Sequence, residues 1–126
     1  MRKKIQQNER IFLAGSKGMV GSSIKRALLK KTFIQKNKKF TLLTPSRLEL
    51  DLLDPLSVKK WFTKKKPNIV ILAAAKVGGI YANFKFPAEF LLDNIKIQTN
   101  VIEAAQKVGV RRFLFLGSSC IYPKNA

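Results

Sequence analysis

The sequence lacks histidine altogether and has a single cysteine, Cys120. Without imidazole, this chain cannot build histidine metal sites or histidine-dependent catalytic pairs, and we expect no metal site. One cysteine excludes an intrachain disulfide, which fits a reducing compartment. No run of about 18 uncharged apolar residues occurs that would predict a membrane-spanning helix. The apolar run after the basic residues 1–4 is too short for a secretory signal, so we predict a cytoplasmic protein without membrane partners.

Acidic residues are also scarce, with 7 Asp and Glu against 25 Lys and Arg, and the net charge is +18. Such an excess attracts polyanions, including nucleic acid and phosphorylated ligands. The lysines nevertheless flank the predicted elements and do not alternate with aromatic side chains, as they would on a nucleic-acid-binding surface. We therefore interpret them as solvated surface and predict no nucleic-acid partner. A hydrophobic content of 46% and a charged content of 25% are typical of a globular domain.

Short apolar runs alternate with helical patterns along the chain. The predicted strands are residues 10–14, 40–44, 48–52, 68–75 and 112–117. The apolar runs within residues 10–14 and 68–75 are continuous, which is typical of strands buried on both faces of a parallel sheet. Helices are predicted from Val20, from the Asp54-Pro55 start signal, and over residues 87–108. The pattern predicts an α/β fold with a Rossmann-like, doubly wound parallel sheet of order 3-2-1-4-5.

The sequence ends soon after the fifth predicted strand. A complete dinucleotide-binding domain usually continues beyond this point. We therefore expect residues 1–126 to form an incomplete domain of this kind, truncated before the last strands and a substrate domain. The exposed sheet edge is expected to make such a chain poorly stable.

The predicted helix over residues 87–108 carries two apolar stripes. One contains Leu91, Ile95, Ile102 and Ala105, and the other contains Phe90, Ile97, Val101, Ala104 and Val108. A helix with so wide an apolar surface has to bury more than one side. We expect one stripe to face the sheet and the other to face a second subunit, which predicts a homodimer.

A glycine-rich turn separates the first predicted strand from the first predicted helix. It reads Gly15, Ser16, Lys17, Gly18, Met19, Val20 and Gly21, a G-x-x-G-x-x-G pattern. Glycines here allow a tight turn, close approach of the backbone to a pyrophosphate and close packing of the helix on the sheet. The helix amino terminus offers N–H groups and a positive partial charge to phosphates. The triplet alone also fits an ordinary turn, but its place between strand and helix favours dinucleotide binding.

The end of the second predicted strand indicates which dinucleotide is bound. NAD-preferring sites place an acid there to hold the ribose 2′-hydroxyl. This segment, Leu43-Thr44-Pro45-Ser46-Arg47, has a cation and no acid. Arg47 is suited to pair with a 2′-phosphate and Lys17 to add a second charge, so we predict NADP; the alternative is that both are ordinary surface cations.

Four segments together resemble the GDP-L-fucose synthase family of the extended short-chain dehydrogenase/reductase superfamily. They are residues 15–21, residues 47–54 (RLELDLLD), residues 73–80 (AAAKVGGI) and residues 115–124 (FLGSSCIYPK). Residues 74–79 (AAKVGG) and residues 117–124 (GSSCIYPK) are specific to this family, whereas the glycine loop indicates only the superfamily. The resemblance extends over nearly the whole chain from Ile11 onward.

The resemblance implies roles for particular positions. Residues 15–21 would hold the pyrophosphate of NADP(H), and Arg47, Leu48, Glu49, Leu50, Asp51 and Leu52 would lie around the 2′-phosphate and adenine. Leu116, Gly117, Ser118 and Ser119 would pass beside the nicotinamide. Ser118 matches the serine of the catalytic Ser-Tyr-Lys set, and Cys120 matches the cysteine that acts as acid and base during epimerisation.

The family's substrate would be GDP-4-keto-6-deoxy-D-mannose. The family inverts C3 and C5 of this sugar and then reduces the C4 ketone with NADPH, giving GDP-L-fucose. A 4-keto group acidifies the protons on both neighbouring carbons, and a cysteine thiol of lowered pKa can exchange them. Ser118 would hydrogen-bond the C4 oxygen as charge develops there. Outside this motif, a lone cysteine such as Cys120 is more often a small buried apolar residue.

Part of the family's machinery is absent from the sequence. Tyr81 and Lys85 have the Tyr-x-x-x-Lys spacing, but they precede the Ser118 strand, whereas the family's pair follows it. Tyr122 has Ala126 four places on, and the family's histidine is also missing. Ser16 and Lys17 replace the His and Arg common in the family's glycine loop. We therefore expect this chain alone to bind NADP weakly and to turn over no substrate.

Three other functions compete with this interpretation. The first is another extended short-chain nucleotide-sugar epimerase or dehydratase with tightly held NAD, against which Cys120 and Arg47 argue. The second is a non-catalytic NADP-binding module, in which the missing tyrosine is a real loss. The third is a basic nucleic-acid binder, supported by charge alone.

Overall fold

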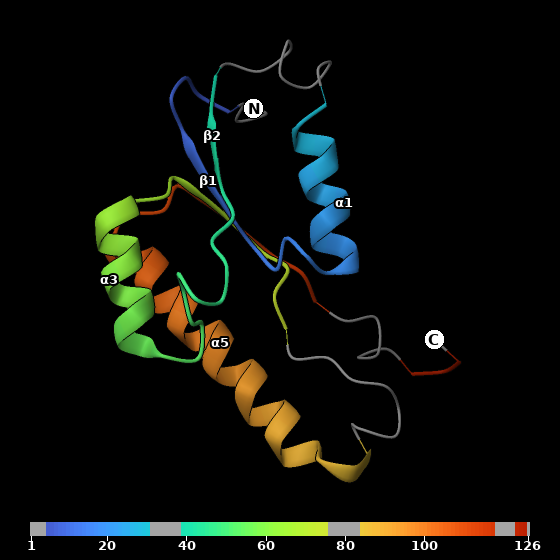
Figure 1. Cartoon of the computed structure of the whole chain (residues 1–126). Coiled ribbons are helices and arrows are strands. Elements are labelled where there is room, and N and C mark those ends of the chain that lie inside the picture. Colours follow the sequence, from blue (N-terminus) through green and yellow to red (C-terminus); the bar gives the residue numbers. More distant parts are fainter. Residues whose placement is uncertain (1–4, 31–38, 76–83, 118–122, 126) are drawn as a thin grey trace.

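The computed structural model describes residues 5–30, 39–75, 84–117 and 123–125 (Figure 1). In chain order its elements are β1 (Arg10–Ala14), α1 (Met19–Leu28), β2 (Thr41–Leu43), α3 (Pro55–Lys65), β3 (Ile69–Leu72), α5 (Pro87–Lys107) and β4 (Arg112–Phe115). These bounds confirm the predicted alternation of strand and helix. Ser118, Ser119, Cys120, Tyr81 and Tyr122 lie outside the described residues.

The described strands form one parallel sheet of order β2-β1-β3-β4. Strand β1 lies inside the sheet, because it pairs with a strand on each side. Phe12 is paired with Leu43 of β2 and with Val70 of β3. This is the order predicted for four of the five expected strands. It confirms the Rossmann-like class.

The predicted strand over residues 48–52 is wrong. Residues 47–49 form a turn in which the backbone N–H groups of Glu49 and Leu50 donate to the carbonyl of Ser46, at 3.1 and 2.9 Å. These N–H groups are therefore not available to a neighbouring strand. The Leu50 side chain is buried in the core, which explains the apolar pattern that suggested a strand.

Alternating residues of β1 and β3 supply two separate apolar cores. Phe12, Ala14, Val70 and Leu72 face α3 and α5 (Figure 1). Ile11, Leu13, Ile69 and Ile71 face the opposite side, where Ile24 and Leu28 of α1 pack (Figure 1). Because each strand buries both faces, its sequence is a continuous apolar run with no alternation.

The predicted start of α3 is confirmed. Asp54 caps the helix, its carboxylate accepting from the N–H of Leu56 at 3.0 Å, and Pro55 occupies the first helical position. The helix anchors to the sheet through Phe62, which is buried and lies 5.5 Å edge-on from the ring of Phe12. It ends at Lys66, which adopts a left-handed conformation (φ 46°).

Helix α5 separates its two apolar stripes as expected, except at Ala105, which was assigned to the outward stripe and is buried. Ile97, Val101 and Ala104 are buried against the sheet, and Ala105 joins them on the buried side. The other stripe stays exposed: Leu91, Ile95 and Ile102 are 62%, 48% and 49% accessible. Among the described residues, α5 included, no helix combines the length and apolar character needed to cross a membrane.

Strand β4 forms one edge of the described sheet and is the least covered strand. Phe113, Leu114 and Phe115 retain 37%, 51% and 45% exposure, although their sequence is that of a buried strand. Their register opposite Val70, Ile71 and Leu72 continues both cores outward. The edge therefore presents apolar side chains on both faces, the feature expected to lower stability.

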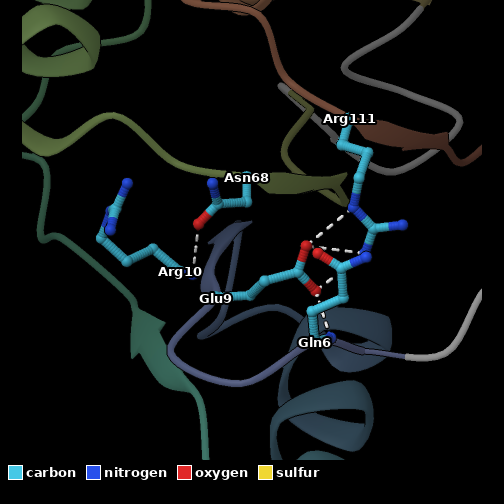
Figure 2. Close-up of polar contacts among 5 residues, drawn as sticks. All are labelled: Gln6, Glu9, Arg10, Asn68 and Arg111. Carbon is cyan, nitrogen blue, oxygen red and sulfur yellow. Dashed lines mark hydrogen bonds and ion pairs between the residues drawn. The ribbon is translucent and has the colours of Figure 1, made fainter.

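A buried ion pair ties together the edge of the sheet where the strands begin (Figure 2). Glu9 is 5% exposed, and the Arg111 guanidinium donates to its two oxygens at 2.7 and 2.8 Å (Figure 2). The N–H of Gln6 donates to the same carboxylate at 2.7 Å. The side-chain oxygen of Asn68 accepts from the N–H of Arg10 at 2.7 Å (Figure 2). Together these bonds join the chain before β1 to the residues before β3 and β4.

Removing the Arg111 side chain leaves the buried carboxylate of Glu9 without its charged partner. We expect Arg111→Ala to lower the free energy of unfolding by about 2–3 kcal/mol in urea titrations. The exposed Lys30→Ala serves as control and should change it by less than about 0.5 kcal/mol. An equal effect of both substitutions would show that the ion pair contributes nothing specific.

Candidate functional site

The candidate site lies at the edge where the parallel strands end. Ala14, Leu72 and Phe115 are the last residues of β1, β3 and β4, and they are in register. The N–H of Ala73 donates to the carbonyl of Ala14 at 3.0 Å, and that of Leu116 to the carbonyl of Leu72 at 3.3 Å. The segments that follow these strands therefore emerge side by side, at the position where open parallel sheets bind their ligands.

Two glycines of the loop after β1 leave no room for a side chain. Gly15 has φ +82°, and a Cβ there would lie 2.7 Å from the backbone of Ala73 and Ala74. A Cβ on Gly21 would lie 1.8 Å from the carbonyl oxygen of Gly15. The first turn of α1 therefore packs directly on the loop, and the loop packs directly on the end of β3.

Gly18 differs from these two glycines. Its φ is −72°, and a Cβ there would meet only the Gly15 oxygen, at an ordinary 3.5 Å. Contacts within the described protein therefore do not require glycine at this position. A side chain there would instead occupy space directly in front of the helix amino terminus.

The amino terminus of α1 is open to an anion. Gly18 is the N-cap, no side chain caps the helix, and its first turn contains no acid. The N–H groups of the first helical turn have no intrahelical acceptor, and the helix dipole adds positive potential. Lys17 and Met19 are exposed beside these groups. This arrangement suits a phosphate group.

The segment after β2 is held in place from the core side. Leu50 is buried, and the Asn100 amide of α5 donates to the carbonyl of Leu52 at 2.9 Å. Arg47 and Leu48 are exposed, so their side chains are accessible to a ligand. The side chain of Leu50 is packed away, so any ligand contact there would come from its backbone.

Asn100 is a positioning residue that the sequence analysis did not identify. Its signal was a polar residue within the apolar stripe of the long helix, between Ile97 and Val101. Such a residue needs a hydrogen-bond partner once its neighbours are buried. Only the structure shows that the partner is the loop of the candidate site.

Leu116 and Gly117 follow β4, two strands away from the glycine loop. With about 4.8 Å between neighbouring strands, this separation is roughly 10 Å. A Cβ on Gly117 would meet nothing within 4 Å, so this position is open. The predicted catalytic residues Ser118 and Cys120 come next in sequence but lie outside the described residues.

Comparison with known sequences identifies the class of protein. The NAD dependent epimerase/dehydratase family matches residues 11–126, and the chain belongs to this family. The chain is 49% identical over 120 residues to GDP-L-fucose synthase 1 of Arabidopsis thaliana, covering 95% of the chain and 35% of that protein. It is 47% identical over 118 residues to GDP-L-fucose synthase of Escherichia coli, covering 94% and 35%. The resemblance inferred from the motifs is confirmed.

A solved structure gives the same class. A GDP-D-glycero-L-gluco-heptose synthase from Campylobacter jejuni, solved in the presence of NADPH, superimposes with a TM-score of 0.83 at 36% identity. The match covers 97% of this chain and 34% of that one. The chain thus spans about a third of the length of the relatives it matches.

Gly21 tests the packing of the site. We expect Gly21→Ala to lower the free energy of unfolding by at least about 2 kcal/mol, because the new methyl group has to displace the Gly15 carbonyl. Gly117→Ala, at an open position, should change it by less than about 0.5 kcal/mol. Urea titration followed by circular dichroism measures both. Equal stability of the two variants would contradict the proposed close contact.

Proposed function

We propose that this chain is the NADP(H)-binding part of a GDP-L-fucose synthase, which acts on GDP-4-keto-6-deoxy-D-mannose. The observation that carries the proposal is the uncapped, acid-free amino terminus of α1 behind the glycine loop. Gly18 leaves that terminus open, and Gly15 and Gly21 bring it against the sheet. The names of the most similar relatives and the neighbouring NADPH-bound structure supply the nucleotide sugar and the cofactor.

Preference for NADP(H) over NAD(H) would come from the segment after β2. Arg47 is exposed there, and Lys17 is exposed in the glycine loop after the neighbouring strand β1. A guanidinium donates two parallel hydrogen bonds to a phosphate, whereas it has no such partner in a 2′-hydroxyl. The nearby Asp51 carboxylate makes a local hydrogen bond, because it accepts from the backbone N–H of Leu53 at 3.0 Å.

The chemistry would take place beyond the end of β4. NADPH, when bound, supplies the hydride for the C4 ketone. Cys120 would remove a proton from a carbon next to the ketone on one face, and a second acid would donate a proton to the opposite face. The same exchange would then take place at the other centre. Ser118 would donate a hydrogen bond to the C4 oxygen as negative charge develops on it. A tyrosine, lysine and histidine from further polypeptide would complete the set.

The alternative is another nucleotide-sugar enzyme of the same family, or a non-catalytic NADP-binding module. A family member that recycles tightly bound NAD favours an acid near position 47, where this chain has arginine. A non-catalytic module would keep cofactor binding but would not depend on Cys120. The two cases therefore differ in the effect of Arg47 and Cys120 substitutions.

We also propose a homodimer formed through α5. The exposed stripe of Leu91, Ile95 and Ile102 lies on the side of the helix away from the sheet, with Leu92 beside it at 54% exposure. Large contiguous apolar patches on a helix are typical of protein interfaces. A second copy of the same stripe would cover the patch by a two-fold contact.

Arg47 decides the choice of cofactor. We expect Arg47→Ala to weaken NADPH binding about tenfold or more and NADH binding by less than about twofold, because only NADPH has the 2′-phosphate. Isothermal titration of the purified chain with each nucleotide measures this. The exposed Lys124→Ala is the control for general charge. Equal losses for both nucleotides would remove the 2′-phosphate assignment.

The catalytic assignments are tested in a chain of the relatives' full length, because this chain spans about a third of it. A chimaera would carry residues 11–126 of this chain in place of the matching segment of the Escherichia coli GDP-L-fucose synthase. We expect it to oxidise NADPH with GDP-4-keto-6-deoxy-D-mannose, whereas this chain alone consumes none. Ser118→Ala should slow NADPH oxidation about 10²–10³-fold.

In the same chimaera, Cys120→Ser should abolish deuterium exchange from solvent at C3 and C5, because the hydroxyl is far less acidic than the thiol. NADPH binding should be unchanged, which separates loss of chemistry from loss of folding. Exchange at the original rate would exclude Cys120 as the acid and base. Steady NADPH consumption by the 126-residue chain alone would contradict the division of the site proposed above.

The dimer is tested by charging the exposed stripe of α5. We expect Ile95→Glu with Ile102→Glu to convert the dimer into a monomer in sedimentation equilibrium, because burying these carboxylates without partners is too costly. Lys30→Glu, at an exposed position just after α1, gives the same net charge change of two units and should leave the dimer intact. A monomeric unsubstituted chain, or a dimer that survives the α5 changes, would contradict the proposal.

A further inference from the structure

A groove of about 400 Å³ lies between α3 and α5, near the ends of both helices and away from the glycine loop. Phe62 of α3 and Ala104 of α5 are buried beneath it, and the partly exposed Val108, the C-cap of α5, forms its apolar floor. Its rim is cationic, with Lys59, Lys66 and Lys107 lining it. Lys59 lies within α3, Lys66 is the C-cap of α3, and Lys107 is the last residue of α5.

The three rim lysines have no acidic partner within the described residues. Their charges are therefore not used to hold α3 and α5 together. Glu103 precedes Lys107 by four residues on α5, but no ion pair joins them in the part of the chain the structure describes. The groove thus combines an apolar floor with positive charge that no carboxylate of the described residues neutralises.

The backbone conformation of Lys66 is unfavourable for a residue with a side chain. It is a non-glycine residue in the left-handed region, at a helix end where glycine is the usual choice. Its carbonyl and that of Lys65 already accept hydrogen bonds from the Arg10 guanidinium, at 2.7–2.9 Å. The end of α3 is therefore capped without the Lys66 ammonium, and stabilising the helix dipole does not explain this side chain.

We propose that this groove binds an acidic, amphipathic helix of a partner protein. Two packed helices form a groove that accepts the apolar ridge of a third, and carboxylates spaced one or two turns apart on its flanks would face the rim lysines. A second copy of this chain is disfavoured as occupant, because it would bring more lysines to the same place. Nucleic acid is disfavoured because Phe62 is fully buried and no other aromatic side chain lines the groove on which bases could stack.

The test uses the purified chain and fluorescence anisotropy with three labelled probes. The first is a synthetic helical peptide with leucines along one face and glutamates on both flanks. The second has the same glutamates with every leucine replaced by serine, and the third is single-stranded oligothymidine. We expect the first peptide to bind at least tenfold more tightly than either of the others. Binding of the serine peptide with equal affinity, or tighter binding of oligothymidine, would overturn the proposal in favour of a general polyanion surface.

Charge-reversal variants locate the site. The combined Lys59→Glu, Lys66→Glu and Lys107→Glu variant should lower the affinity for the leucine peptide at least tenfold. The matched control carries Lys30→Glu, Lys96→Glu and Lys124→Glu, which are exposed lysines outside the groove with the same total charge change. It should lower the affinity less than threefold. Equal losses in the two variants would show that only net charge matters.

The Lys66→Gly variant separates loss of the lysine side chain from loss of folding. Glycine adopts the left-handed conformation without penalty, so the melting temperature should not fall. The affinity for the leucine peptide should still drop about threefold or more. Unchanged affinity in this well-folded variant would exclude Lys66 from the site and contradict the proposed rim.

Discussion

The contact between Gly21 and the carbonyl oxygen of Gly15 is the constraint on which the rest of this site depends. It brings the first turn of α1 onto the end of β1, while Gly15 itself lies against the backbone of Ala73 after β3. One close-packed junction thus fixes the loop, the helix and two strands relative to each other. This junction places the first turn of α1, and with it the free N–H groups of that turn, against the ends of β1 and β3.

The parallel sheet has two ends, one where its strands begin and one where its strands end, and these two ends have different physical roles. At the edge where the strands begin, polar groups satisfy one another: Arg111 binds the buried Glu9, and Asn68 binds the backbone of Arg10. At the edge where the strands end, the polar groups that lie at the amino terminus of α1 are left open. A satisfied edge stabilises the fold, whereas an open edge retains the interaction energy that a bound phosphate can use.

Much of this architecture could be predicted from the sequence because it rests on local rules. The Asp54-Pro55 start of α3, the strand over residues 10–14 and the double-striped helix all appear where the pattern placed them. The strand expected over residues 48–52 failed because Leu50 is buried by a turn, and an apolar residue buried from a loop looks the same as one buried from a strand. The exposure of Phe113, Leu114 and Phe115 could not be predicted either, since it depends on which elements cover β4 and not on β4 itself.

The sequence by itself determined the class of the fold, the position of the glycine loop and the candidate residue Arg47, because these depend on short-range spacing and residue chemistry. Its resemblance to a known family nominated Ser118 and Cys120. Only the tertiary structure decided why each glycine is there. Gly15 and Gly21 are required by contacts with residues that meet them in space, whereas Gly18 is required by no contact within the described protein. The same holds for Asn100. The sequence shows that it is polar, but its hydrogen bond to the carbonyl of Leu52 exists only because α5 packs against the loop that contains Leu52.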